Sequence, residues 1–246
     1  KIDLKTNKIT SCEALVRWFR EGRVISPNKF IPLFEKNRFI IKLDKYIFQK
    51  ACEDIQYINK LLKEKTFLNN CNHKNNNNEP FNNNFFITAS INISKEHFAY
   101  DNFIMEYYDM VKQTNVPREL IELEITESAS VYKGINLKQI TKDMKQKGFT
   151  IALDDFGTGY SSLNMLQDLS IDVLKIDKSF IDRIDESNLV KYIIDMAKDF
   201  NIKTVAEGVE TKEQVDILKN MGCDMAQGYY YSKPLNLEDF VAFLQK

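Results

Sequence analysis

The sequence predicts an α/β fold in which a largely parallel β-sheet closes into a barrel. Strand-like and helix-like segments alternate along the 246 residues and make six or seven β–α units. Alternation of this kind indicates repeated βαβ units and a parallel sheet. That number of units in one chain of this length favours a closed barrel. An open, doubly wound sheet remains the alternative.

The first half of the chain begins with a strand and turn in "KIDLKTNKIT" and a second strand-like run over Ile9–Trp18. Ser26 and Pro27 then supply an N-cap and a first-turn proline for a helix in "PNKFIPLFEK". Apolar residues at three- and four-residue spacing from Leu43 to Leu62 predict a long amphipathic helix. The next expected elements are a strand in "FFITASINIS", a helix over Asp101–Thr114 and a strand in "LIELEIT".

The second half continues the same alternation. A helix over Ile135–Lys147 ends at Gly148, a residue type that favours helix termination. The following elements are a strand in "FTIALDD", a strand in "DVLKID", a helix from about Glu186 to Phe200, a strand in "KTVAEG", a helix over Thr211–Met221, a strand-like "CDMAQGYYY" and a last helix from Asn236.

One segment interrupts this pattern. Residues 69–84 are rich in asparagine and have no hydrophobic periodicity. A stretch of this composition cannot bury a core, so we expect a flexible surface insertion between a helix and a strand. The remainder of residues 1–246 is expected to form a single domain.

Composition excludes several classes of protein. Hydrophobic residues make up 43% of the chain, enough for a buried core, and the net charge of −1 predicts no broad surface for duplex DNA or RNA or for a membrane. Apolar runs fall far short of the roughly 20 residues that a membrane span needs. Four scattered cysteines without C-x-x-C spacing fit reduced thiols. We therefore expect a cytoplasmic domain, whether or not the full-length protein carries a membrane anchor.

Polar residues stand at the end of almost every predicted strand. In a parallel barrel all strands end at one mouth, where barrel active sites are built. Carboxylates with an amide oxygen are hard ligands that suit Mg²⁺ or Mn²⁺ better than zinc. A single acid at a strand end is most often a solvated residue or a helix cap, and only the whole set points to metal. The set is Glu13, Asn92, Glu124, Asp154, Asp155, Lys175, Glu207 and Gln227.

The adjacent acids Asp154 and Asp155 favour a site for two ions. Two metals about 3.5–4 Å apart are a common device for in-line displacement at phosphorus. One of two neighbouring carboxylates can bridge such ions. The glycines Gly157 and Gly159 that follow give the loop conformational freedom, but without a P-loop lysine they are a weak indication of a phosphate loop.

At this point the sequence resembles the EAL domain, a family of cyclic-di-GMP-specific phosphodiesterases. The family's motifs appear in its order and cover nearly the whole chain. They are "EALVRW", "FIPLFE", "INIS", "ELEITES", "IALDDFGTGYSSL", "VLKIDKSFI", "VAEGVET" and "QGYYYSKPL".

The resemblance implies a modified TIM-type (β/α)8 barrel with one antiparallel strand, the first, which we expect to be incomplete here. It also implies hydrolysis of cyclic-di-GMP to linear pGpG with two Mg²⁺ or Mn²⁺ ions. The metal ligands that it implies are Glu13, Asn92, Glu124, Asp154, Asp155 and Glu207. The catalytic residues that it implies are Lys175, Glu207, Gln227 and Glu127. Of these, Lys175 and Gln227 would act on the attacking water, and Glu127 would brace the loop Phe156–Ser162. Arg17 and Leu15 would contact substrate, Arg17 on the same strand face as Glu13.

The resemblance further implies a homodimer, coupled to activity through the loop Phe156–Ser162, and fusion to sensory or GGDEF domains outside this chain. Two residues depart from the family's pattern near the expected guanine pocket. Phe34 stands where alanine is common and Arg38 where glycine is common. The alternative functions are a non-catalytic cyclic-di-GMP receptor or protein-interaction module, and a barrel enzyme acting on another phosphoester. The complete ligand set favours the active phosphodiesterase.

Overall fold

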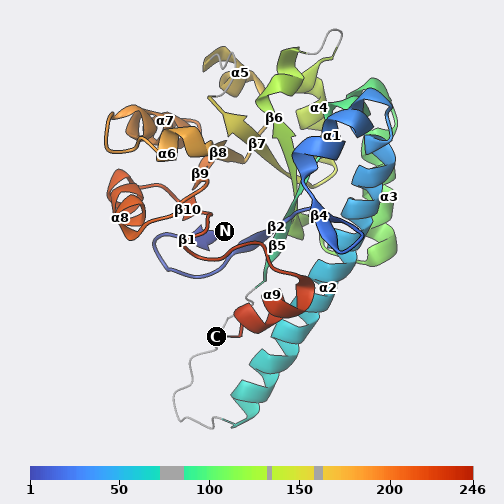
Figure 1. Cartoon of the computed structure of the whole chain (residues 1–246), viewed down its shortest axis with the longest axis horizontal. Helices are drawn as coiled ribbons and strands as arrows, with labels where there is room; N and C mark the ends of the chain where they lie inside the picture. Colours follow the sequence, from blue (N-terminus) through green and yellow to red (C-terminus); the bar gives the residue numbers. More distant parts are fainter. Residues whose placement is uncertain (73–85, 132–134, 158–162, 246) are drawn as a thin grey trace.

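The computed structural model describes residues 1–72, 86–131, 135–157 and 163–245. Its main sheet has eight strands in the order β1-β10-β9-β8-β7-β6-β5-β2, and Figure 1 shows them arranged as a ring with helices outside it. The strands are β1 (Ile2–Asp3), β2 (Ser11–Ala14), β5 (Thr88–Asn92), β6 (Ile121–Thr126), β7 (Thr150–Phe156), β8 (Val173–Ile176), β9 (Lys203–Ala206) and β10 (Met225–Ala226). Within this sheet, each neighbouring pair between β10 and β2 in the strand order is parallel.

The first strand closes the ring. β1 pairs antiparallel with β10, with Ile2 opposite Ala226. On its other edge it meets the approach to β2: the Lys1 main-chain nitrogen donates to Ser11 O (2.7 Å), and Thr10 N donates to Lys1 O (3.0 Å). The predicted barrel with one antiparallel strand is therefore confirmed. Whether this strand is incomplete stays a prediction.

The helices lie outside the ring and follow the strands in sequence (Figure 1). They are α1 (Pro27–Lys36), α2 (Ile40–Asn72), α3 (Phe103–Thr114), α4 (Leu137–Gln146), α5 (Leu163–Asp168), α6 (Lys178–Ile181), α7 (Leu189–Asp199), α8 (Lys212–Met221) and α9 (Leu237–Phe243). Short 3₁₀ turns occupy η1 (Lys95–Ala99), η2 (Arg118–Leu120) and η3 (Glu127–Val131). Within the described residues, no helix combines the length and the apolar character needed to cross a membrane.

Alternation along each strand separates the core from the barrel interior. On β6, Ile121, Leu123 and Ile125 belong to the main core cluster, whereas Glu122 and Glu124 point to the opposite face. Inside the ring, a small apolar cluster combines Ala152, Val173 and Val205 with Met225 packed against them. Each of these four residues precedes a polar site residue by two positions, so the apolar cluster forms a floor beneath part of the barrel mouth.

Several predicted boundaries were wrong. Ile9–Trp18 is not one strand, because β2 ends at Ala14 and Trp18 starts a separate exposed hairpin of β3 (Trp18–Arg20) and β4 (Arg23–Ile25). Residues 69–72 of the predicted insertion belong to α2, which runs ten residues past Leu62 to Asn72, and residues 73–85 lie outside the described part of the chain. The short helices α5 and α6 were not predicted.

Candidate functional site

The eight polar residues predicted at the strand ends meet at one mouth of the barrel. Glu13, Glu124, Asp154 and Lys175 lie on strands, Asn92 ends β5, and Glu207 and Gln227 directly follow β9 and β10. Asn92 is the direct partner of Glu124, whereas Glu13 pairs with Ser90 and Asp154 with Thr126, so these site residues are offset along the register by two positions. The parallel register therefore brings these side chains together, as the sequence predicted.

Lys175 is the central cation of the site. Its side chain is 1% exposed, and its Nζ lies 2.8 Å from Glu124, 2.9 Å from Asp154, 2.9 Å from Glu207 and 3.8 Å from Glu13. Burial lowers the pKa of Lys175, but these carboxylates outweigh burial and hold the pKa well above its ordinary value. The side chain is therefore an ammonium ion that ties four strands to one point.

Amide side chains hold the carboxylates on the β2 side of the mouth. Asn92 Nδ2 donates to Glu13 Oε1 (3.0 Å) and to Glu124 Oε2 (3.3 Å). Gln227 Nε2 donates to Glu13 Oε2 (2.5 Å). The Oε1 atom of Gln227 is buried, and among the described residues no group donates a hydrogen bond to it. A buried acceptor of this kind is available to a water or ligand inside the site.

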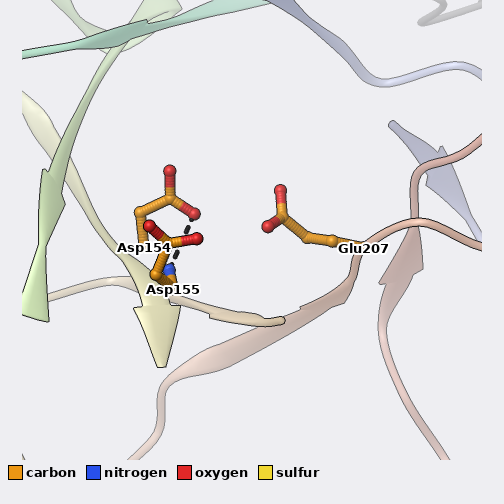
Figure 2. A group of neighbouring side chains, drawn as sticks. All are labelled: Asp154, Asp155 and Glu207. Carbon is orange, nitrogen blue, oxygen red and sulfur yellow. Dashed lines mark hydrogen bonds between the residues drawn. The ribbon is translucent and has the colours of Figure 1, made fainter. Parts of the chain in front are cut away.

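The two aspartates reach the same space through a bulge in β7. The pairing with β8 shifts register between Leu153 and Phe156, and Asp155 has a left-handed backbone (φ 55°). The strand thus continues one residue past the predicted "FTIALDD" and ends at Phe156. Figure 2 shows both carboxylates facing Glu207 across the mouth, with Asp155 N donating to Asp154 Oδ1 (2.9 Å).

The carboxylates crowd one another electrostatically. Burial raises the pKa of Glu207 to about 8, with Asp154 adding to the effect against the opposing charge of Lys175. Burial, followed by Glu124, raises the pKa of Glu13, and burial, followed by Asp154, raises that of Asp155. Burial opposes ionisation of Glu124 too, but Lys175 and Lys1 lower its pKa to about 2. One central lysine therefore does not compensate all of these acids.

The donor set fits divalent cations. Asp154, Asp155 and Glu207 each offer an oxygen, and these oxygens all lie within 4.8 Å of one another. Carboxylate oxygens are the ligands that Mg²⁺ and Mn²⁺ prefer. Positive charge at this mouth would offset the raised pKa values of Glu13, Asp155 and Glu207, and a bound water could donate to Gln227 Oε1, which accepts no hydrogen bond from the described residues.

Glu127 lies behind the metal-ligating candidates, at the start of η3. It is 3% exposed, and its Oε2 accepts a hydrogen bond from Gly157 N (3.0 Å). The contact fixes the chain two residues after Asp155 and matches the bracing position expected from the sequence. Residues 158–162 of the predicted coupling loop lie outside the described residues.

Leu15 and Arg17 lie beyond the end of β2, so the predicted alternation with Glu13 does not apply to Arg17. Both are exposed, and Arg17 Nη1 donates to Val16 O (2.8 Å). They nevertheless line the same open pocket of about 760 Å³ as Glu13, Glu207 and Gln227. Both residues are therefore accessible from the barrel mouth.

The two departures from the family's pattern lie near β3 and α1. Phe34 packs against Trp18 and Phe39, with ring centroids 6.0 and 4.8 Å away. Arg38 has a left-handed backbone (φ 60°) just after α1. Neither is among the described residues that line the pocket.

Lys1 and Glu122 are site neighbours that the sequence reasoning missed. Lys1 Nζ lies 2.5 Å from Glu122 Oε1 and 2.8 Å from Glu124 Oε1, inside the barrel. The sequence contained an indication of this contact. Glu122 and Glu124 are two residues apart and lie on one strand face, and two buried acids on one face require a nearby cation.

A comparison with protein-family models decides the family. Residues 1–234 match the model of the EAL domain. The chain belongs to the EAL domain family. This EAL domain is 34% identical over 247 residues to a probable cyclic di-GMP phosphodiesterase, PdeB of Escherichia coli K12, and 31% identical over 247 residues to the cyclic di-GMP phosphodiesterase NbdA of Pseudomonas aeruginosa. The two matches cover 100% and 98% of the chain, which spans only 43% and 29% of these relatives' lengths.

A solved structure supports the same assignment. The EAL enzyme Bd1971, in a form bound to cAMP and cyclic-di-GMP, superposes with a TM-score of 0.87 at 30% identity. The match covers 99% of this chain and 62% of that one. The similarity therefore extends over nearly the whole of this chain and over part of each relative.

Proposed function

We propose that this EAL domain is a divalent-metal-dependent phosphodiesterase that hydrolyses cyclic di-GMP to linear pGpG. The observation that carries the proposal is the convergence of a complete acid and amide set around one buried lysine at the barrel mouth. Relatives named as cyclic di-GMP phosphodiesterases, and a solved relative bound to cyclic-di-GMP, support the choice of substrate. The EAL domain is proposed to be the single domain of this chain.

In this proposal the acids hold two ions. Glu13, Asn92, Glu124 and Asp154 would hold one, and Asp154, Asp155 and Glu207 the other. Bound Mg²⁺ or Mn²⁺ supplies positive charge to the phosphoryl oxygens and makes water more acidic.

The remaining residues orient the reactants. Lys175 would keep the carboxylates in place and donate a hydrogen bond to the attacking water, and Gln227 Oε1 would accept one from it. Arg17 would bind a substrate phosphate through its guanidinium group, with Leu15 against the base. Glu127 would keep Asp155 in position through Gly157. Dimer formation, fused regulatory domains and cytoplasmic location remain predictions.

Chromatography of the reaction products tests the proposal directly. The purified chain with Mn²⁺ or Mg²⁺ should convert cyclic di-GMP to pGpG. Lys175→Met should lower kcat by about 10²–10⁴, the usual contribution of a positioned proton-handling side chain. Lys138→Met, which changes an exposed lysine paired with Asp168, is the matched control and should leave the rate unchanged.

Two results would contradict these assignments. If the wild-type chain binds cyclic di-GMP but does not hydrolyse it with either metal, the chain is a receptor and the catalytic proposal fails. If Lys175→Met turns over at the wild-type rate, the role given to Lys175 is wrong.

A further inference from the structure

A second lysine lies inside the barrel, below the mouth. The Lys1 side chain is 1% exposed, and its Nζ contacts Glu122 Oε1 (2.5 Å) and Glu124 Oε1 (2.8 Å). Its main chain is fixed by β1, which pairs with β10 and with the approach to β2. The pairing of β1, which begins at the next residue, therefore holds the Lys1 ammonium group inside the barrel.

The barrel interior explains why a cation is needed at this place. Beneath Asp154, Lys175, Glu207 and Gln227 the floor is apolar, formed by Ala152, Val173, Val205 and Met225. Beneath Glu13, Asn92 and Glu124, the residues two positions earlier are Ser11, Ser90 and Glu122. This half of the floor is polar, and it contains a buried carboxylate. Among the described residues, Lys1 is the one that forms an ion pair with Glu122.

The same ammonium also fixes one oxygen of a proposed metal ligand. Lys1 binds Oε1 of Glu124, whereas Lys175 and Asn92 bind its Oε2. The two lysines therefore hold the carboxylate from opposite oxygens and define its orientation. Glu124 is fully buried, so water does not compete for Oε1.

We propose that Lys1 is a positioning residue of the metal site, which occupies Oε1 of Glu124 so that Oε2 faces Glu13, Asn92 and Asp154. This inference rests on the metal-binding part of the proposed function. The competing explanation is that Lys1 only neutralises Glu122 and has no effect on how Glu124 meets an ion.

The two explanations predict opposite results when Lys1 is removed from a chain that already lacks the Glu122 carboxylate. Removing an ammonium group makes the mouth more negative, so charge alone would strengthen the binding of a cation. Loss of a hydrogen bond that orients a charged ligand would weaken it, by about ten-fold for a bond of the usual strength. Weaker binding of the cation would therefore show that Lys1 orients the Glu124 carboxylate.

Titration of Mn²⁺ into the chain, followed by the electron paramagnetic resonance of free Mn²⁺, measures affinity without turnover. The deciding comparison is Glu122→Leu against Lys1→Met/Glu122→Leu, because neither leaves Glu122 as an unpaired buried charge that could unfold the chain. Glu122→Leu should bind Mn²⁺ within about two-fold of wild type, since Lys1 still holds Glu124. The double variant should bind about ten-fold more weakly. Lys138→Met is the surface control.

Equal or tighter Mn²⁺ binding by the double variant, relative to Glu122→Leu, would overturn the role of Lys1. Wild-type chain that binds Mn²⁺ but does not hydrolyse cyclic di-GMP would contradict the proposed function and leave the Lys1 comparison valid. Absence of Mn²⁺ binding by the wild type would contradict both.

Discussion

Replacing Glu207 by glutamine should remove a pH dependence of stability in the metal-free chain. Burial raises the pKa of Glu207 to about 8, from 4.5 for an ordinary glutamate. A carboxyl with a raised pKa binds its proton more tightly in the folded state than in the unfolded state. Its contribution to stability is therefore fully present below pH 4.5 and is lost as the pH rises toward 8.

The size of this effect follows from the difference between the two pKa values. The difference of about 3.5 units (8 − 4.5) corresponds to at most about 5 kcal/mol at 1.36 kcal/mol per unit. Glu207 shares Lys175 with three other carboxylates, and buried sites respond as if their dielectric constant were about 20, so we expect about 2 kcal/mol. The lowered pKa of Glu124, about 2, acts below pH 4.5 and does not enter this window.

Urea unfolding in EDTA between pH 5.5 and 8 measures the effect. Over this range the free energy of unfolding of the wild type should fall by about 2 kcal/mol relative to that of Glu207→Gln. The difference between the two chains is the quantity to compare, because burial lowers the pKa of the Lys1 main-chain amine to about 6, and its titration in the same range raises the stability of both chains with pH. The raised pKa values of Glu13 and Asp155 contribute to the pH dependence of both chains alike. Glu53→Gln, on an exposed face of α2, is the control. A free energy of unfolding that changes with pH equally in the wild type and in Glu207→Gln would refute the reasoning.

Three further predictions concern stability and are checked by urea unfolding. Asn59→Ala should cost about 2–3 kcal/mol, because Asn59 donates to Ile55 O and Ile87 O and accepts from Ile87 N; a cost no larger than that of the exposed Gln49→Ala would contradict this. Gly228→Ala should cost about 3 kcal/mol or more, because a Cβ there would lie 2.1 Å from the main-chain oxygen of Val209. Gly22→Ala, with nothing within 4 Å, should cost only about 1 kcal/mol for its positive φ, and equal costs at the two glycines would refute the steric argument. Arg38→Gly should stabilise the chain by about 0.5–1 kcal/mol by relieving its left-handed backbone, and a loss of stability would show that the Arg38 side chain makes a larger contribution.

The fold could be predicted from the sequence because its strands and helices carry distinct periods. The helix in "PNKFIPLFEK" was predicted with its observed bounds, since Ser26 and Pro27 mark its start. The polar residues after the apolar runs predicted the barrel mouth, because parallel strands all end at the same end of the barrel. The period of each element is a local property that a sequence displays.

The individual contacts that side chains from several strands make at the mouth could not be predicted. Nothing in "VLKID" shows that Lys175 meets four carboxylates from four other strands. The bulge that brings Asp155 toward Glu207 requires a non-glycine residue at positive φ, which the sequence does not favour. Arg17 was misplaced because strand propensity continues through "EALVRW", whereas the chain leaves the sheet after Ala14. Tertiary pairing overrides propensity in each case.

The interior charges connect the stability of this fold to its proposed chemistry. Five carboxylates, those of Glu13, Glu122, Glu124, Asp154 and Glu207, share two described lysines, Lys1 and Lys175, inside the barrel. Unpaired buried charge opposes folding, so this arrangement keeps part of the site protonated when no metal is bound. Divalent ions at the mouth would replace those protons and stabilise the fold at the pH where hydrolysis is proposed to occur. The acids that make the empty barrel less stable are the same acids that would bind the ions, and Lys1 limits that instability to the mouth by neutralising Glu122 beneath it.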